Sequence, residues 1–395
     1  MRKKHLYIFL AYLAIAYSAI HFFLGPLPQI AFILVVLVVH KKSPFLSKTL
    51  IKIILFVLLI ILGQTLIFNK FSVYETISVI VSTILISFLL FQYLEISFPE
   101  FYVKALYYIS IISLFFYASS MLIPGFHSFI RTIPVRFPFL DPQGRQFILH
   151  SVSYATDTLT GLYRHNGVFH EPGVFGLFLT IGLFFNYIVF KQVFNKYGIV
   201  FLVSVLTTFS TASFLALGVL FLGFSYTAER LKFLRYPVFV IIGALFVFFF
   251  LNSNIMYEKI VFEYERDMAK SMEQTTAGRI YGARKSFYVM GKYPFTGRGL
   301  TPVTRVEDET SPEFIRYGIL GEFAKVGIPA ALLYLFFLIK GVKLYGWLYN
   351  EPRITNFFIA ALLINLLAQS FAFTPVMMNF VLLGIFSKKY ISTKV

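Results

Sequence analysis

The chain is dominated by apolar segments that are long enough to cross a lipid bilayer and that recur along almost its whole length. A helix of about 20 residues spans a hydrocarbon core of roughly 30 Å. Such segments fall near residues 6–23, 27–39, 49–68, 76–96, 103–123, 172–190, 197–208, 211–227, 237–253, 318–339, 354–371 and 374–387. The second, seventh and twelfth are short enough to be tilted partners or half-helices. The sequence therefore predicts an all-α, polytopic membrane helix bundle of about 12 spans.

The composition supports this fold class and excludes several kinds of site. Hydrophobic residues make up 58% of the chain and charged residues only 13%. Cysteine is absent, which excludes disulfides, thiolate metal sites and a cysteine nucleophile. The amino-terminal stretch "MRKKHLYIFLAYLAIAYSAIHFF" lacks a small-residue cleavage site, so we interpret it as an uncleaved first helix rather than a signal peptide. Residues 1–395 are expected to form a single transmembrane bundle domain.

Lysine and arginine positions predict the orientation of this bundle. Short loops on the cytoplasmic side carry an excess of these residues. If the amino terminus is cytoplasmic, most basic loop residues fall inside and the short outer turns hold almost none but Lys70. The net charge of +17 is then mainly a topology signal and does not argue for nucleic acid. Both termini are expected in the cytoplasm, and segments 124–171 and 254–317 become large outer loops.

The two predicted outer loops hold most of the polar chemistry. Segment 124–171 is a basic surface with three acids only, namely Asp141, Asp157 and Glu171. In segment 254–317, Thr275 or Thr276 is placed to cap a short helix that begins near Gly278. The free backbone N–H groups of its first turn, beside Arg279, would form an anion site. The stretch "YPFTGRG" would end this helix.

Three motifs in this region resemble a known family. "RHNGVFHEPGVFG" precedes a span, "TTFSTASFLAL" lies at an outer helix turn, and "GRIYGARKSFYVMGKYPFTGRG" lies in the large outer loop. Over roughly residues 150–330 the chain resembles the O-antigen ligase and polymerase superfamily, and its Glu-Pro after "NGVF" is more similar to the repeat-unit polymerases of the Wzy type. Ligases of that family carry a histidine with asparagine eleven residues ahead of a glycine. Counted back from Gly327, this chain has Arg316 and Tyr317 there.

The resemblance implies a GT-C-like glycosyltransferase of the bacterial inner membrane. It would move a growing glycan from undecaprenyl diphosphate to a sugar hydroxyl of the next lipid-linked repeat unit, at the outer face, as in lipopolysaccharide O-antigen synthesis. The implied partners are the lipid-linked donor and acceptor glycans, membrane lipid, a chain-length regulator and a flippase, with no nucleic acid. No cofactor and no metal is expected.

The same resemblance suggests which residues carry the chemistry. Arg164 and Arg279 match motif arginines and would stabilise the charge of the departing diphosphate, with Arg316 as a third candidate. The acceptor hydroxyl would be deprotonated or oriented by Glu171, His170 or His165. The residues expected to contact substrate are His165, Arg145, Arg284, Arg298, Tyr281 and Tyr317.

Each candidate also has a purely structural interpretation. Arg164 and Arg279 suit headgroup anchors, and Glu171 before Pro172 suits the first turn of a helix. The histidines suit hydrogen-bonding loop residues, and the hydroxyls of "TTFSTASF" suit close helix packing. Glu322 and Lys325, three residues apart, are expected to form a structural ion pair.

Two other function classes stay open. A ligase would use the same chemistry with a lipid core sugar as acceptor, and the missing histidine–asparagine pair disfavours it. A transporter would carry charges along mid-membrane helices and show repeat symmetry, whereas this sequence concentrates its charges in the outer loops.

Overall fold

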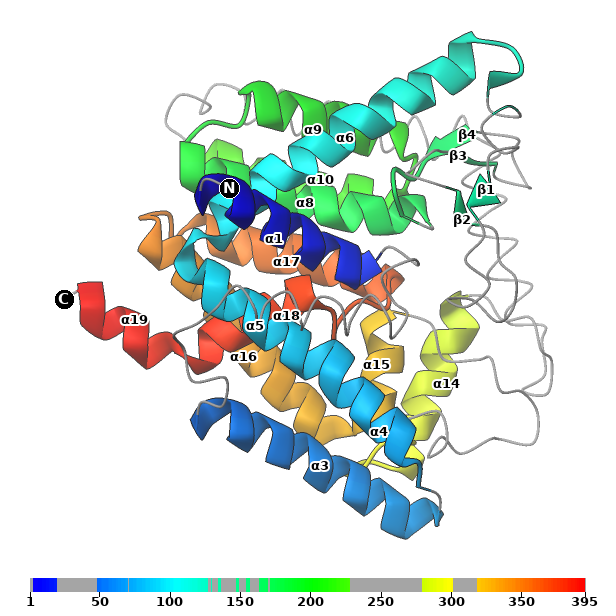
Figure 1. Cartoon of the computed structure of the whole chain (residues 1–395), viewed down its shortest axis with the longest axis vertical. Coiled ribbons are helices and arrows are strands. Elements are labelled where there is room, and N and C mark those ends of the chain that lie inside the picture. Colours follow the sequence, from blue (N-terminus) through cyan, green and yellow to red (C-terminus); the bar gives the residue numbers. More distant parts are fainter. Residues whose placement is uncertain are drawn as a thin grey trace. The chain divides into compact units, whose positions relative to one another are not determined.

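The computed structural model describes residues 3–19, 48–69, 71–126, 129, 134–135, 147–148, 154–156, 163–169, 171–227, 279–300 and 318–394 (Figure 1). Most of these residues are helical. The chain divides into two compact units. Unit 1 consists of Met1–Pro28, Leu90–Phe246 and Val342–Asn365. Unit 2 consists of Gln29–Leu89, Val247–Gly341 and Leu366–Val395.

Four helical stretches among the described residues are long and apolar enough to cross a membrane. They are Lys48–Phe68, Thr76–Leu122, Pro172–Phe190 and Ile328–Leu348. Five shorter apolar helices accompany them. These helices indicate an α-helical protein embedded in a membrane, as the hydropathy pattern predicts. The predicted spans at 27–39 and 237–253 lie outside the described residues.

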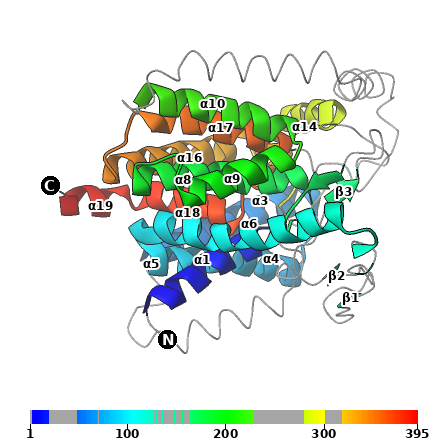
Figure 2. The same ribbon diagram turned by 90° about the horizontal axis from the view of Figure 1, so that it is seen from above.

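Unit 1 is built around one deeply buried helix. Its helices are α1 (Lys3–Ala19), α6 (Phe98–Leu122), α8 (Pro172–Phe190), α9 (Lys196–Thr207) and α10 (Thr211–Thr227). The central one is α8, which packs against α6, α9 and α10, and Figure 2 shows it beside α9. In its apolar window 89% of residues are buried. Pro172 starts α8 at a position where its missing N–H costs nothing, and Lys191 ends it in a left-handed conformation with φ 56°.

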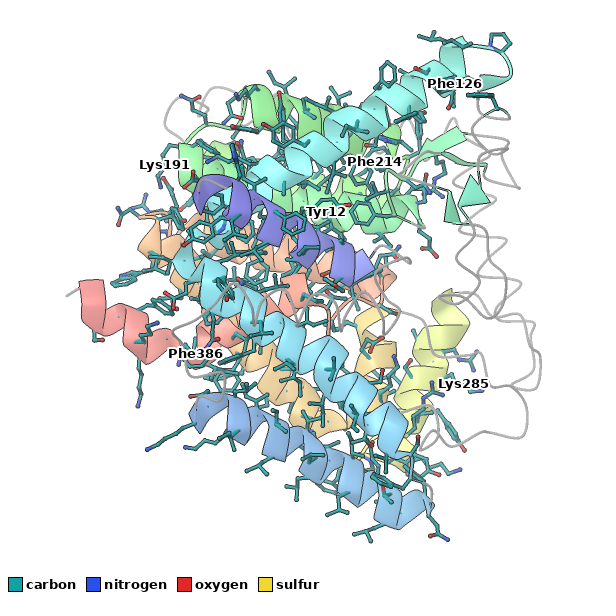
Figure 3. The ribbon with its side chains drawn as sticks, viewed as in Figure 1. Tyr12, Phe126, Lys191, Phe214, Lys285 and Phe386 are labelled. Carbon is teal, nitrogen blue, oxygen red and sulfur yellow. The ribbon has the colours of Figure 1, made fainter. Side chains whose placement is uncertain are left out.

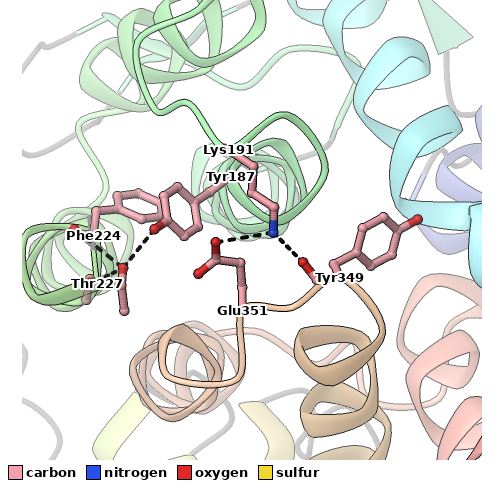
Figure 4. Close-up of polar contacts among 7 residues, drawn as sticks. Tyr187, Lys191, Phe224, Thr227, Tyr349 and Glu351 are labelled. Carbon is pink, nitrogen blue, oxygen red and sulfur yellow. Dashed lines mark hydrogen bonds and ion pairs between the residues drawn. The ribbon is translucent and has the colours of Figure 1, made fainter. Parts of the chain in front are cut away.

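Polar contacts fix the carboxyl-terminal end of α8 (Figure 4). Lys191 Nζ lies 3.2 Å from Glu351 Oε1 and also donates to the carbonyl of Tyr349. One turn earlier, the hydroxyls of Tyr187 and Thr227 are 3.0 Å apart. These contacts tie α8 to α10 and to the loop after α16 (Ile328–Leu348).

Unit 2 contains the more exposed span α3 (Lys48–Phe68), of whose apolar window only 17% is buried. Its other elements are α4 (Val73–Val79), the π-helix η2 (Ile80–Leu85), α14 (Arg279–Lys292), α15 (Gly318–Val326), α18 (Pro375–Ile385) and α19 (Ser387–Lys394). The π-helix contacts α3 and α18. Three helices have residues in both units, namely α5 (Ile86–Leu94), α16 and α17 (Ile354–Ala368).

Two predicted span boundaries differ from the structure. The expected span 318–339 is two helices, α15 and α16, separated by Gly327 with φ 82°. A Cβ at Gly327 would lie 2.5 Å from the carbonyl oxygen of Phe295, so a close backbone approach as well as the positive φ requires glycine. The expected spans 76–96 and 103–123 form one helical run, which contains the π-helix Ile80–Leu85 and the 3₁₀ turn Glu95–Ser97.

Within unit 2, α16 and α18 approach each other through two glycines. A Cβ at Gly341 would lie 1.8 Å from the carbonyl oxygen of Phe380, and one at Gly384 would lie 2.1 Å from that of Phe337. Small residues allow helix backbones to approach closely where no hydrophobic force drives them together. Neither glycine was singled out from the sequence.

Segment 124–171 contains two short antiparallel β-hairpins that the sequence did not predict. The first pairs β1 (Pro134–Val135) with β2 (Phe147–Ile148), and the second pairs β3 (Tyr154–Thr156) with β4 (Tyr163–His165). The second hairpin matters most for function, because β4 carries two of the predicted site residues directly before α8.

The predicted orientation can be tested because the chain has no cysteine of its own. Phe295→Cys introduces a thiol at a position that is 79% exposed, in the predicted outer loop region. Lys388→Cys introduces one at an exposed position on the predicted cytoplasmic side. An impermeant maleimide applied outside intact cells should label the first and not the second. The reverse pattern would invert the predicted orientation.

Candidate functional site

The stretch after β4 forms a tight turn that leads into α8. Gly167 adopts φ 57°, and the backbone N–H of Phe169 donates to the Asn166 carbonyl at 3.0 Å. Asn166 Nδ2 donates in turn to the carbonyl of Phe169 at 2.8 Å. The buried Phe169 ring stacks on Phe175 and Phe178 in the first turns of α8, with centroids 5.3 and 4.8 Å apart. The turn is therefore fixed to the helix by its own apolar residue.

The same turn docks on the connection between α9 and α10. Arg164 Nε donates to the backbone carbonyl of Thr208 at 3.2 Å. His165 Nδ1 lies 2.9 Å from the hydroxyl oxygen of Thr207. Two motifs that the sequence separates by about 40 residues, "RHNGVFHEP" and "TTFSTASF", thus form one site in unit 1, which we call the hairpin–turn site.

Close packing of α8 against α10 supports this arrangement. A Cβ at Gly176 of α8 would lie 1.8 Å from Ser213 Oγ on α10. The hydroxyl-rich motif therefore allows close helix packing, as the structural interpretation of the sequence expected. Its first two threonines also bind the side chains of Arg164 and His165, which that interpretation did not include.

His165 is fully buried, between an aromatic ring on α6 and one on α8. Its ring stacks on Tyr117, with centroids 4.8 Å apart, and meets Phe175 edge-on at 5.0 Å. Burial lowers the pKa of His165 to about 3, against a smaller opposing effect of the Ser113 backbone. The imidazole is therefore neutral at neutral pH, and in this conformation it offers no exposed surface to a substrate.

This depressed pKa predicts a pH dependence of stability. In the unfolded chain the histidine pKa returns to about 6.5, so the unfolded state binds a proton below that pH. The folded state binds this proton only near pH 3 and below. The contribution of His165 to stability is therefore complete above pH 6.5 and is lost as the pH falls. Between pH 7 and pH 5 the loss should be about 2 kcal/mol. Thermal unfolding of the protein and of His165→Gln at both pH values measures it, and equal shifts in the two proteins would contradict the prediction.

Glu171 lies at the surface of the same site. It occupies the N-cap position of α8 with an extended backbone, and its carbonyl oxygen accepts from the N–H groups of Val174 and Phe175. Its carboxylate is exposed and makes no capping hydrogen bond. The negative charge therefore stands at the positive end of the α8 dipole and is accessible from outside.

The candidates in the predicted outer loop 254–317 belong to unit 2. Arg279 begins α14, close to the predicted start near Gly278, and Tyr281 follows in its first turn; their side chains lie outside the described residues. On the same helix Arg284 is exposed, whereas Lys285 beside it is buried. Figure 3 labels Lys285 on α14. Arg298 is buried in the loop after α14, where its backbone N–H donates to the Ala324 carbonyl at 2.9 Å.

Gln64 organises this part of unit 2 and was missed from the sequence. Its Nε2 donates to the carbonyls of Thr296 and Lys325 at 2.6 and 2.9 Å. Its Oε1 accepts from the backbone N–H of Leu300 at 2.9 Å. One fully buried amide thus joins α3, the loop after α14 and the end of α15. The sequence signal that would have identified it is an uncharged polar residue within an apolar span.

Comparison with known proteins adds no relative. The chain matches no model of a known protein family, and no curated protein is similar to it. The candidate site therefore rests on the geometry of this chain and on the motifs themselves.

Arg164, His165 and Glu171 belong to unit 1, and Arg284 and Arg298 belong to unit 2. His170, Arg145, Arg316 and Tyr317 lie outside the described residues. The expected ion pair is confirmed, since Lys325 Nζ and Glu322 Oε1 are 2.8 Å apart. Among the described residues, no group of three histidine or acidic side chains is placed to hold a metal ion.

Proposed function

We propose that this protein is a glycosyltransferase that polymerises undecaprenyl diphosphate-linked oligosaccharide repeat units at the outer face of the bacterial inner membrane. The observation that carries the proposal is the hairpin–turn site. It places an arginine of β4 and the exposed carboxylate of the α8 N-cap residue near the amino-terminal end of a buried apolar helix.

The chemistry of such a transfer matches these groups. Departure of the lipid diphosphate develops negative charge, which a fixed guanidinium stabilises better than a mobile one because it need not reorganise during the reaction. Arg164 is fixed by its bond to Thr208. Arg279 and Arg316 in the large outer loop are proposed to supply further positive charge. The exposed Glu171 is proposed to deprotonate or orient the acceptor hydroxyl.

The membrane architecture fits the same proposal. A GT-C-like bundle of about 12 spans would keep the lipid carrier in the bilayer and the glycan outside it. Both termini would be cytoplasmic, and segments 124–171 and 254–317 would be the two large outer loops. Lipopolysaccharide O-antigen or another surface polysaccharide is the proposed product.

Incubation of the purified protein with lipid-linked repeat units tests this function directly. A ladder of products that differ by one repeat unit is expected on a gel. A single transfer to a lipid core sugar would instead identify a ligase. No covalent product, together with movement of the lipid-linked glycan across a proteoliposome membrane, would identify a transporter.

Glu171→Gln tests the proposed acceptor-activating role. If the carboxylate acts as a base, turnover should fall by a factor on the order of 10² or more while donor binding stays nearly unchanged. If it only favours the α8 dipole, the cost is about 1 kcal/mol or less of stability and the ladder should persist. Glu322→Gln and Glu351→Gln would each break an ion pair, so Glu171→Gln is compared with the unchanged protein at matched protein levels. A normal ladder from Glu171→Gln would remove this residue as the base.

A further inference from the structure

Unit 2 contains an apolar cavity of about 450 Å³ behind the exposed span α3. One stripe of α3, from Lys52 through Phe56 to Ile60, forms its first wall. The π-helix η2, α16 and α18 supply the others, and the Glu322–Lys325 pair closes one end. Phe56 lines the cavity and is also 43% exposed, so the cavity opens to the surroundings of α3.

The walls favour a hydrocarbon occupant over water. Most lining side chains are aliphatic or aromatic. Two of its polar groups already have partners, because the Tyr334 hydroxyl donates to the Ala372 carbonyl and Lys325 is paired with Glu322. Water enters a cavity only where several polar groups can bind it, and an empty cavity deprives its walls of dispersion contacts.

The volume indicates which hydrocarbon fits. If a methylene group takes roughly the 30 Å³ that a water molecule occupies in the liquid, the cavity holds at least on the order of 15 carbons. That is enough for one acyl chain of a bilayer phospholipid.

The positive charge of Lys52, at the opposite end of the cavity from the Glu322–Lys325 pair, also favours a phospholipid. Lys52 lines the cavity in the first turns of α3 and is exposed. Within the described part of the chain its ammonium forms no ion pair, in contrast to Lys325. A phospholipid whose chain entered the cavity from this end would place its phosphate beside Lys52.

We propose that this cavity is a phospholipid site, in which one acyl chain lies between α3, η2, α16 and α18 and the lipid phosphate pairs with Lys52. The lipid comes from the leaflet at the amino-terminal end of α3. The site is independent of the proposed transferase function, and its test needs no glycan substrate.

Native mass spectrometry of the full chain tests the proposal. The protein is reconstituted into nanodiscs of phosphatidylethanolamine and phosphatidylglycerol, extracted again and washed in mild detergent. One phospholipid should remain bound per chain. Ala330→Trp fills the cavity and should lower the retained lipid by a factor on the order of ten. Leu332→Trp places the same side chain on α16 at a position that is 61% exposed and outside the lining, and should not change retention.

A variant and a matched control also test the contact between Lys52 and the phosphate. Lys52→Gln should weaken lipid retention about fivefold, the usual contribution of one basic residue near a lipid headgroup. Lys48→Gln, an exposed lysine on the same helix that does not line the cavity, should have no effect. If Ala330→Trp does not fold, Val57→Trp fills the cavity from α3 instead. No lipid on the unchanged protein, as when another segment of this chain occupies the cavity, would overturn the proposal. Equal retention in the filling and control variants would also overturn it.

Discussion

A Gln64→Leu variant is expected to unfold with a free energy about 2 to 4 kcal/mol below that of the unchanged protein. Leucine has a similar volume, so the loss comes from polar groups and not from a cavity. The carbonyls of Thr296 and Lys325 and the N–H of Leu300 would each lose a partner inside the protein. The Lys325 carbonyl keeps a second partner, the backbone N–H of Gly299 at 3.3 Å. The other two groups are left without their partner, at a cost of about 1 to 2 kcal/mol each.

Thermal unfolding of the purified protein in detergent measures this effect. Gln92→Leu is the matched control, because Gln92 is a half-buried glutamine of α5 for which the described residues show no side-chain hydrogen bond. Its free energy of unfolding should change by less than about 1 kcal/mol. Similar midpoints for the two variants would mean that the amide of Gln64 contributes little to stability.

Arg164→Ala is expected to reduce polymer formation by a factor on the order of 10² to 10³, the usual loss when a fixed donor to a developing negative charge is removed. Arg164→Lys should restore little activity, since an ammonium group cannot reproduce the planar fork of a guanidinium. Product ladders, read at matched protein levels, give the measurement.

Stability must be measured alongside activity, because the bond from Arg164 to Thr208 also holds β4 on the α9–α10 connection. Arg353→Ala, at an exposed arginine before α17, controls for the loss of one positive charge. If activity falls only as far as the folded fraction falls, Arg164 is structural. Full activity of Arg164→Lys would mean that the residue supplies surface charge alone.

Helix limits were predictable where apolar composition and a local signal coincide. The span predicted at 172–190 is the helix α8, which begins at a proline, and the span at 211–227 is α10. Gly327 shows where this reasoning fails, because the break there depends on the carbonyl of Phe295, a partner some 30 residues away. The β3–β4 hairpin was missed for a similar reason, since a three-residue strand has too few residues to show a periodic pattern.

The candidate site was predictable as a set of residue types and not as an arrangement. The motifs contained Arg164, Glu171 and the hydroxyl turn, but no local pattern shows that Arg164 contacts Thr208. His165 was expected in a loop and is buried, because Tyr117 and Phe175 come from helices on either side of it. Burial of a polar side chain is a property of its tertiary neighbours, which neither spacing nor composition specifies.

The π-helix η2 constrains the number of residues that this part of the chain can contain. A π turn holds one more residue than the α-helical turn that would otherwise take its place. Deletion of a single residue between Ile80 and Leu85 would allow the backbone to return to α-helical geometry, and every following side chain of α5 would then rotate by about 100° around the helix axis. Thr83 and Ile84 line the cavity from this turn, and Val79 lines it from the residue just before. Insertions and deletions should therefore be far less acceptable here than substitutions between apolar side chains of similar size.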